Sequence, residues 1–251
     1  MSTEKIQKIL AAVGYGSRRA LEVLIKDGRV RVNNQVAKLG DRADSTKDHF
    51  SIDGRPCRRV GKPTESRVLL YNKPLGQVCT RDDPEGRKTV FEGLPRVDNG
   101  RWISVGRLDI NTSGLLLFTN DGELANRLMH PSSEIQREYA VRILGKVTPE
   151  IVENLVNGVE LEDGVGRFEH VMDAGGEGAN HWFHVVAVEG KNRIVRRLWE
   201  SQDLTVSRLK RVRFGPIFVP KSLRQGTWLE LEKSQIKDLV ESIDPEEMID
   251  N

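Results

Sequence analysis

A charged pair, Arg107 and Asp109, stands inside the stretch Gly106–Asn120 and is the first candidate for chemistry in this chain. The apolar run Leu115–Phe118 follows directly and is too short for a helix, so it is typical of a buried strand. Asp109 is therefore expected on a loop at the mouth of a core strand, where functional side chains are often mounted. From these residues alone, a structural Asp109 that caps a turn or pairs with an arginine is the simpler interpretation.

The elements that must position this loop read as many short strands with a few helices between them. The spacing of apolar residues predicts strands at Val68–Tyr71, Trp102–Val105, Glu138–Ile143, Phe168–Met172, Trp182–Val188, Val206–Phe214 and Trp228–Leu231. Gln77–Thr80 is expected to pair with the first of these strands as a hairpin, after the break at Lys73-Pro74-Leu75-Gly76. Hairpin-type connections and few βαβ alternations predict an α+β fold with a mainly antiparallel mixed sheet flanked by helices.

Helices are expected after Asp121, which can act as an N-cap, and after Thr148-Pro149, which combines a capping hydroxyl with a proline in the first turn. A basic helix is predicted from about Asn192 to Gln202, and a final acidic helix from about Ser234 to Ser242. The polar segment 61–66 lacks periodicity and is interpreted as a linker between domains at 1–60 and 67–251.

The first 60 residues predict two short helices followed by short strands. Apolar residues at helical spacing end at Gly14, and Ser17 can cap a second helix that ends at Gly28. Asn33-Asn34 can adopt positive φ and predicts a tight hairpin. Ser17-Arg18-Arg19 would place free N–H groups and two guanidiniums together, which favours phosphate binding.

The net charge of +2 conceals a segregated pattern. Residues 1–62 carry 14 Lys/Arg against 7 Asp/Glu, and residues 190–225 carry 10 against 2. A solvated charged surface explains either block alone. The two blocks together favour a polyanion partner, and nucleic acid is the better interpretation.

Composition and cysteine usage limit the other classes. No apolar stretch approaches the roughly 20 residues that a membrane span needs, and the N-terminus lacks a basic segment followed by an apolar one, so no secretory signal is expected. The two cysteines, Cys57 and Cys79, have no metal-type spacing, which fits a reduced cytoplasmic setting. We expect a monomer that makes no contact with membranes.

Metal and nucleotide chemistry find little support. His181 and His184 lie three apart on a predicted strand and would point to opposite faces, with no carboxylate or Cys cluster to complete a ligand set. The chain has no phosphate-binding loop of the Walker type, no dinucleotide fingerprint and no nucleophile elbow. We therefore expect neither a metal nor a cofactor.

The N-terminal block resembles the alpha-L type of small RNA-binding domain, first described in a small-subunit ribosomal protein, over roughly residues 3–60. The resemblance rests on Lys8-x-Leu10, Gly14, Ser17-Arg18-Arg19, Leu24-Ile25, Gly28-Arg29-Val30 and Val32-Asn33. It implies binding to structured RNA and no reaction. The basic residues expected off the apolar stripes are Lys5, Lys8, Arg18, Arg19, Arg29 and Arg31.

The larger part of the chain resembles the pseudouridine synthases, in the branch of ribosomal enzymes that carry an alpha-L domain. The motifs are Gly106-Arg107-Leu108-Asp109-x-x-Thr112-x-Gly114-Leu115-Leu116, Lys73-Pro74-x-Gly76, Asn120-Asp121-Gly122, His130-Pro131, Arg137-Glu138-Tyr139 and Glu189-Gly190-Lys191-Asn192-Arg193-x-Val195-Arg196-Arg197. The similarity spans about residues 5–232. Within the family, the chain looks most similar to the branch that acts on large-subunit ribosomal RNA.

This resemblance implies that a uridine in ribosomal RNA, presented by a structured stem-loop, is isomerised to pseudouridine without cofactor or metal. Asp109 would be the catalytic carboxylate, Arg196 its basic partner and Tyr139 the ring that stacks on the flipped uracil. Arg107 is a hypothesis for the group that fills the vacated place in the RNA stack, while Arg193 and Arg197 would contact phosphates. Each of these residues also has a plain structural interpretation, as a salt bridge or a core side chain.

Two other functions remain as alternatives. One is a non-catalytic RNA-binding factor, for example in ribosome assembly, and the other is a nucleotide hydrolase that uses Asp109. The simultaneous presence of Asp109, Tyr139 and Arg196 favours the enzyme over the binding factor, because a protein that only binds RNA has no need of all three. The missing phosphate loop and metal set disfavour the hydrolase.

Overall fold

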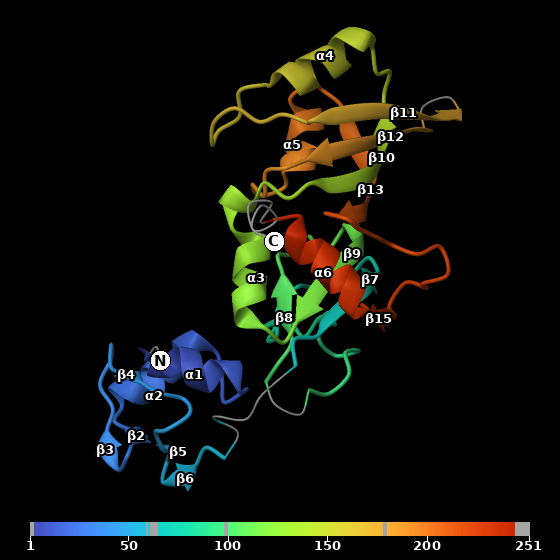
Figure 1. The fold of residues 1–251 in the computed structure, drawn as a ribbon. Helices are drawn as coiled ribbons and strands as arrows, with labels where there is room; N and C mark the ends of the chain where they lie inside the picture. Colours follow the sequence, from blue (N-terminus) through green and yellow to red (C-terminus); the bar gives the residue numbers. More distant parts are fainter. Residues whose placement is uncertain (1–2, 59, 61–64, 98–99, 178–179, 244–251) are drawn as a thin grey trace, which may run out of the picture. The chain divides into compact units, whose positions relative to one another are not determined.

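The computed structural model describes residues 3–58, 60, 65–97, 100–177 and 180–243 (Figure 1). The chain forms two compact units. The first comprises residues 1–67, 95–103 and 119–122, and the second comprises residues 68–94, 104–118 and 123–251. Most of the segment interpreted as a linker, residues 61–64, lies outside the described residues.

The first unit begins with the two expected helices. They are α1 (Ile6–Ala12) and α2 (Arg18–Lys26). Ser17 caps α2 as predicted, since its Oγ accepts from the Ala20 N–H at 3.0 Å. The apolar faces of both helices, including Leu10 and Leu21, are fully buried in one cluster with Val30 and Phe50. Burial of these faces stabilises helices that are too short to persist alone.

Short strands complete this unit. Its described strands are β1 (Glu4–Lys5) paired with β4 (Arg42–Ala43), and a sheet in the order β3 (Gln35–Val36), β2 (Val30–Val32), β5 (Phe50–Ile52), β6 (Arg55–Pro56). Asn33 and Asn34 join β2 to β3 with φ of 48° and 68°, which confirms the predicted hairpin turn.

The second unit is built on one large, mainly antiparallel sheet. Its main path is β11 (His170–Glu177), β12 (Asn180–Ala187), β10 (Arg137–Leu144), β13 (Thr205–Phe214), β9 (Ser113–Thr119), β7 (Val68–Lys73), β15 (Trp228–Glu230). Two short strands, β14 (Ile217–Phe218) and β8 (Ile103–Val105), pair with β13 and β9. The β13–β9 pair is parallel, so the sheet is mixed. The α+β class predicted from the sequence is confirmed.

The predicted hairpin between Val68–Tyr71 and Gln77–Thr80 is wrong. Strand β7 has β9 and β15 as its neighbours, and Val78 forms only an isolated bridge with Thr89. The stretch Gln77–Thr80 is therefore part of a loop and not a strand of the sheet. This loop contacts β7 through side chains, since the Tyr71 hydroxyl donates to the Gln77 side chain at 2.7 Å.

Strand β9 lies in the centre of this unit and is buried along its whole length, as the run Leu115–Phe118 predicted. Leu115 and Leu117 pack in the cluster that also receives α3 (Gly122–Met129) and α6 (Lys233–Glu241). On the opposite side of the strand, the Phe118 ring contacts the ring of Phe91, with centroids 5.3 Å apart. The loop that carries Asp109 enters this strand directly and is thus anchored in the core.

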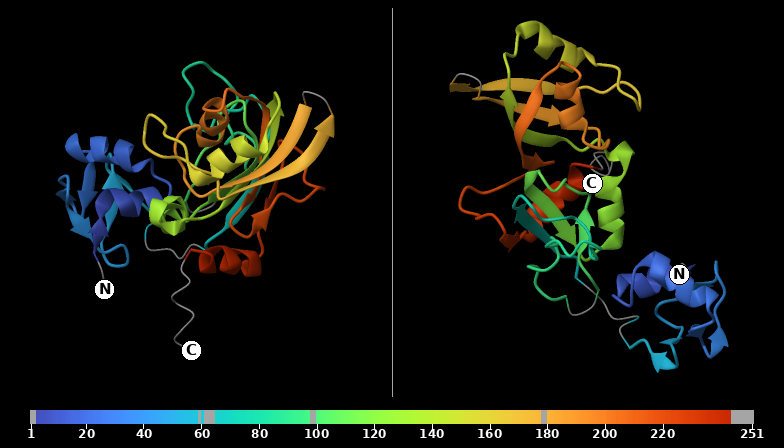
Figure 2. Two further views of the ribbon diagram at one scale, coloured as in Figure 1. Left: turned by 90° about the horizontal axis from the view of Figure 1, so that it is seen from above. Right: turned by 180° about the vertical axis from the view of Figure 1, so that it is seen from behind.

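Two helices cover one face of the strands β10, β11, β12 and β13. They are α4 (Pro149–Asn157) and α5 (Ile194–Glu200), and both lie on the same side of these strands (Figure 2, left view). Thr148 caps α4 as predicted, and the Trp199 ring of α5 packs on Phe183 with centroids 5.4 Å apart. Helix α5 is shorter than the range predicted for it, because Arg193 precedes it in the left-handed region with φ of 50°.

Candidate functional site

The Asp109 loop forms a hydrogen-bonded turn whose neighbours fix its backbone. The Thr112 N–H donates to the Asp109 carbonyl at 3.0 Å, and the Gly76 N–H donates to the Ile110 carbonyl at 2.8 Å. The Cys79 thiol donates to the Leu108 carbonyl at 3.2 Å. Gly76, from the predicted break, and Cys79, from the stretch Gln77–Thr80 wrongly predicted as a hairpin strand, therefore support the loop from the side.

A buried lysine lies beneath the same loop. Lys73 is 0% exposed at the end of β7, and its Nζ donates to the carbonyls of Asp109 at 3.0 Å, Thr112 at 2.8 Å and Pro74 at 3.1 Å. These three acceptors use the full donor capacity of an ammonium. Burial lowers the pKa of Lys73, and the nearby Cys79 and Asp109 oppose that shift. Lys73 thus ties both ends of the turn to the core.

Arg196 lies behind the loop and joins it to β13 and α5. Its Nη2 donates to the Asn111 carbonyl and its Nη1 to the Val206 carbonyl, both at 2.9 Å. The side chain is buried, and burial together with the charge of Arg193 lowers its pKa, against the effect of Asp109. Arg196 was expected as the direct partner of Asp109. Its hydrogen bonds go to backbone carbonyls, while its charge acts on Asp109 through space.

The Asp109 carboxylate opens into a pocket of about 470 Å³. Tyr139, Arg107 and Arg193 line the same pocket, so these predicted residues are brought together, whereas Arg196 and Arg197 are not among the lining residues. The Asp109 side chain is half-buried and makes no hydrogen bond or ion pair with any of the residues that the structure describes. Its oxygens therefore keep their acceptor capacity for a bound molecule.

Two pocket residues were missed by the sequence reasoning. Arg137 and Arg211 line the pocket beside Tyr139, and both guanidiniums lie over the Phe214 ring, 5.3 and 5.4 Å from its centroid. Arg211 donates to the Leu115 carbonyl at 2.7 Å and is only 3% exposed. Burial lowers the pKa of Arg137.

The chemistry available to this pocket follows from its walls. The Asp109 carboxylate and the half-polar ring of Tyr139 line one pocket, together with apolar groups of Leu108, Val195 and Phe214. Such walls accommodate a flat, uncharged ring by stacking and apolar contact. The carboxylate then acts as a nucleophile or base on the group attached to that ring. Among the residues that the structure describes, no three His, Cys, Asp or Glu side chains gather into a metal-type cluster.

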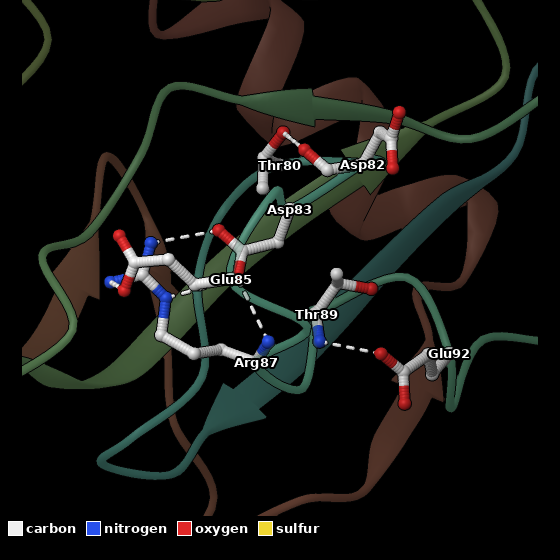
Figure 3. A network of polar contacts seen from close by, with 7 residues as sticks. All are labelled: Thr80, Asp82, Asp83, Glu85, Arg87, Thr89 and Glu92. Atoms are coloured by element: carbon white, nitrogen blue, oxygen red, sulfur yellow. Dashed lines mark hydrogen bonds and ion pairs between the residues drawn. The ribbon is translucent and has the colours of Figure 1, made fainter.

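The acidic loop of residues 80–92 carries its own network of ion pairs and hydrogen bonds (Figure 3). Arg87 donates from Nη2 and Nε to the Asp83 carboxylate at 2.7 and 3.0 Å, and it also pairs with Glu85 at 3.0 Å. The Arg87 hydrogen bond holds the pKa of Asp83 below its usual range. At the end of the loop, the Thr89 N–H donates to the Glu92 carboxylate at 2.7 Å. The sequence predicted a loop here and gave no sign of this network.

The basic residues predicted to bind RNA fall into two groups in the first unit. Arg18 and Arg19 are exposed in the first turn of α2, directly after the capping Ser17, and Lys5 is exposed on β1. Arg29 instead forms a two-point ion pair with Asp53, at 2.8 and 2.7 Å, and Lys8 pairs with Glu4 at 2.5 Å. The α2 start is thus the part of this set that presents unengaged guanidiniums.

Arg101 adds a cation that the sequence reasoning missed. It belongs to the same unit, and its pKa is lowered by burial and by the positive charge of Arg18. Its Nε is buried without a hydrogen-bond partner among the described residues. In the second unit, Arg193 and Arg197 are engaged by Glu200 at 3.3 Å and by Asp163 at 2.7 Å.

No helix in the described part of the chain has both the length and the apolar character that crossing a membrane requires. This finding agrees with the apolar runs seen in the sequence.

Comparison with known proteins identifies both parts of the chain. The family model described as RNA pseudouridylate synthase matches residues 67–210, and the S4 domain model matches residues 4–49. A solved structure described as a pseudouridylate synthase aligns with a TM-score of 0.66 at 23% identity, covering 94% of this chain and 99% of that one. At this identity, the likeness concerns the fold.

Proteins named ribosomal large subunit pseudouridine synthase B are similar over almost the whole chain. The protein from Pseudomonas aeruginosa is 61% identical, and the match covers 96% of this chain and 62% of the relative. The proteins from Vibrio vulnificus and Escherichia coli K12 are 60% and 53% identical, with 96% and 95% of this chain and 76% and 84% of the relatives covered. The chain thus spans less than two thirds of the first of these relatives and more of the others. The chain belongs to the RNA pseudouridylate synthase family and carries an S4 domain at its N-terminal end.

Proposed function

We propose that this protein converts a uridine of large-subunit ribosomal RNA to pseudouridine. The observation that carries the proposal is the pocket lined by Tyr139, the buried Arg211 and Asp109, whose carboxylate is unengaged among the described residues. The family of the chain supports this reaction, and the names of its relatives support the large-subunit substrate.

The reaction is an isomerisation, and groups in the pocket are available to bind the base and to act on the ribose. The target uridine leaves the RNA stack and enters the pocket, at a cost on the order of a few kcal/mol that contacts with Tyr139 and the apolar walls offset. Asp109 then acts on the ribose, either at C1′ as a nucleophile or at the 2′ proton as a base. The N1–C1′ bond breaks and the uracil rotates. C5 then bonds to C1′ as the Asp109 carboxylate leaves C1′ or, in the base route, as the 2′ proton returns; the C5 proton is released while N1 gains one.

Other residues position these groups. Arg196 holds the Asn111 carbonyl and Lys73 holds the Asp109 and Thr112 carbonyls, so the loop stays fixed while the base turns. Preorganised charge of this kind supplies much of the rate acceleration in enzymes. Arg107 is exposed at the pocket rim, from which its guanidinium can stack in the place that the flipped base has left.

A protein that only binds RNA is the second interpretation of the fold, and the geometry disfavours it. A binding pocket for RNA has no use for a half-buried carboxylate, because carboxylate and phosphates repel. Here the carboxylate is held in place by three loop supports, Lys73, Arg196 and the Gly76 N–H, and its oxygens are unengaged. Burying the cations Lys73 and Arg196 beside the loop of one acid costs desolvation free energy, and such an arrangement is typical of a catalytic site.

We further infer how the parts of the chain divide the work. Residues 1–60 would dock structured RNA, such as a stem-loop, through the basic start of α2, residues 61–66 would link, and residues 67–251 would carry catalysis. The protein would act as a monomer, in which Asp109, Tyr139 and Arg107 line one pocket. The free thiols of Cys57 and Cys79 support a reduced cytoplasmic setting.

Asp109→Asn tests the catalytic role. The substitution keeps the shape of the side chain and removes no hydrogen bond that the structure describes, so the variant is expected to fold and to bind RNA with wild-type affinity. Pseudouridine formation, measured as tritium release from RNA that contains 5-tritiated uridine, is expected to vanish. Tritium release by this variant at a measurable rate would overturn the assignment.

The matched control is Asp203→Asn. Asp203 is an exposed aspartate with φ of 57°, a conformation that asparagine tolerates well. This variant is expected to retain the wild-type rate, which separates loss of one particular carboxylate from loss of negative charge in general.

A further inference from the structure

The part of the sheet formed by β10, β11, β12 and β13 has one face on which neither α4 nor α5 lies. Helices α4 and α5 both lie against the other face of β10, β11, β12 and β13 (Figure 2, left view). We call the face without α4 and α5 the open sheet face and define it by six residues: Arg142, Met172, Trp182, His184, Arg208 and Lys210.

Strand alternation assigns these side chains to the open side. Phe183 packs on Trp199 of α5, so its neighbours on β12, Trp182 and His184, point the other way. On β13, Leu209 and Arg211 are buried, whereas Arg208 is exposed and Lys210 half-exposed. The catalytic pocket is lined by Leu209 and Arg211 and therefore belongs to the opposite face.

The register of the strands sets these residues in two rows. Trp182 pairs with Arg142, which pairs with Arg208. His184 pairs with Ala140, which pairs with Lys210. Ala140, in the centre of the second row, has only a methyl side chain and leaves space above the sheet. A flat group can occupy this space, between the aromatic rings of β12 and the cations of β13. Arg208 and Lys210, two residues apart on one strand, are separated by about 6.7 Å along it.

Several charged side chains on this side of the sheet are paired with one another, and two of its cations are not paired within the described part of the chain. Arg213 donates to Glu138 at 2.9 Å, and His184 shares a 2.7 Å hydrogen bond with the other Glu138 oxygen. Arg142 is held by the Ser207 hydroxyl at 2.9 Å. Arg208 and Lys210 have no hydrogen bond or ion pair within the part of the chain that the structure describes.

We propose that the open sheet face is a second RNA-binding surface, which takes a single-stranded segment other than the one that presents the target uridine. Arg208 and Lys210 would contact successive phosphates, and Trp182 would stack on a base. Sheets that combine exposed rings with cations are a recurrent platform for single-stranded RNA. Taking RNA as the partner rests on the proposed function, but the surface lies away from the catalytic pocket.

The test uses the full chain with Arg208→Gln and Lys210→Gln combined. The probe is a fluorescein-labelled oligoadenylate of 12 nucleotides, which contains no uridine and so cannot serve as a substrate. We expect the double variant to bind it about tenfold more weakly at 0.1 M salt. The slope of log affinity against log salt should fall by about 1.4, because two single-strand phosphate contacts are lost.

The matched control is Lys221→Gln combined with Lys237→Gln, two exposed lysines outside the open sheet face. Affinity for oligoadenylate and its salt slope should remain at wild-type values. Equal affinities of the two double variants would overturn the proposal, and so would a wild-type chain that does not bind the probe. A protein partner at this face would give the first of these results.

A second readout separates this proposal from the proposed function. Pseudouridine formation on a short stem-loop substrate should be unchanged in the Arg208→Gln, Lys210→Gln variant, because neither side chain lines the catalytic pocket. If the wild-type chain makes no pseudouridine, the proposed function fails, whereas the oligoadenylate measurement still decides the open sheet face. Loss of stem-loop turnover in the double variant alone would show that the two surfaces are not separate and would count against the proposal.

Discussion

The Lys73 ammonium lies beneath the turn that presents Asp109 and donates two hydrogen bonds to it, at the Asp109 and Thr112 carbonyls, and a third to the Pro74 carbonyl. A buried carbonyl that loses its donor costs about 1–3 kcal/mol. Asp109 itself takes no part in this support through its side chain. The position of the reactive carboxylate is therefore set by cations that bind the backbone on either side of it.

Lys73→Met should separate the contribution of the ammonium charge from that of the buried aliphatic part of the side chain. Methionine fills a similar volume, so the chain should fold, with a free energy of unfolding lower by about 2 kcal/mol because carbonyls lose their donor. The turn should then shift, and a displacement of about 1 Å at a reacting group costs on the order of 100-fold in kcat. Single-turnover kinetics on a stem-loop substrate measure the change.

The control for this variant is Lys88→Met, which removes an exposed lysine from the same unit. It should leave both kcat and the free energy of unfolding near wild-type values, since exposed substitutions change stability little. If Lys73→Met retained the wild-type kcat, the ammonium would have only a structural role.

Sequence reasoning at this scale found the groups that face the pocket and missed those that support them. Asp109 and Tyr139 were identified through family motifs, and both line one pocket. Lys73 stood in a quoted motif, but a lysine by itself predicts an exposed side chain. Arg211 was hidden because β13 carries basic residues on both faces, so its sequence shows no polar alternation there. Burial of such groups is decided by the partners that the fold supplies.

At the scale of elements, the local signals were reliable and the pairing of strands was not. Caps at Ser17 and Thr148 and the turn at Asn33 depend on neighbouring residues, and each was predicted. The partners of β7 are β9 and β15, which lie far away in the sequence. A hairpin would pair β7 with the segment that follows it directly in the sequence. Because β7 is buried between two strands, its partners are β9 and β15, and local sequence signals do not identify such distant strands.

The close pairing of β9 with β13 requires a glycine at position 114 of the motif. Gly114 pairs with Arg211 in the parallel register, and a Cβ at this position would lie 2.1 Å from the Arg211 carbonyl oxygen. Its φ of 100° is also unfavourable for other residues. The glycine that follows Asp109 in the motif therefore permits the close approach of the two strands that carry the pocket.

Gly114→Ala should lower the free energy of unfolding by about 3 kcal/mol or more, because backbone must move against backbone. Urea denaturation measures this change. Gly86→Ala is the matched control: Gly86 also has positive φ, at 67°, but a Cβ there meets nothing within 4 Å. That variant should lose only about 1 kcal/mol, the cost of the left-handed backbone. Equal losses in the two variants would mean that strain in φ, and not strand approach, explains Gly114.

At the scale of the whole molecule, the basic charge is divided between the two compact units. The two basic blocks seen in the sequence fall into different compact units. The charge pattern predicts a polyanion partner at two places, but it does not tell which cations remain unengaged. The structure makes that distinction: Arg29 and Arg197 are bound to carboxylates, whereas Arg18 and Arg19 are exposed at the start of α2.

The segments 95–103 and 119–122 belong to the first unit together with residues 1–67. Deletion of residues 1–60 would therefore strip these segments of their packing, and Gly14 and Gly100, for instance, approach so closely that a Cβ on Gly14 would meet the Gly100 carbonyl at 2.4 Å. Substitution of exposed side chains in the full chain is the cleaner way to test the docking role of the first unit.

Arg18→Gln combined with Arg19→Gln should weaken binding to a ribosomal RNA fragment about tenfold at 0.1 M salt and reduce the salt slope by about 1.5. The variant should fold normally, because neither side chain has a described partner and its loss relieves the repulsion between Arg18 and Arg101. The kcat at saturating stem-loop should not change. Lys38→Gln with Arg55→Gln, which neutralises two exposed charges elsewhere in this unit, is the control. If both pairs weakened binding equally, general charge and not the start of α2 would dock the RNA.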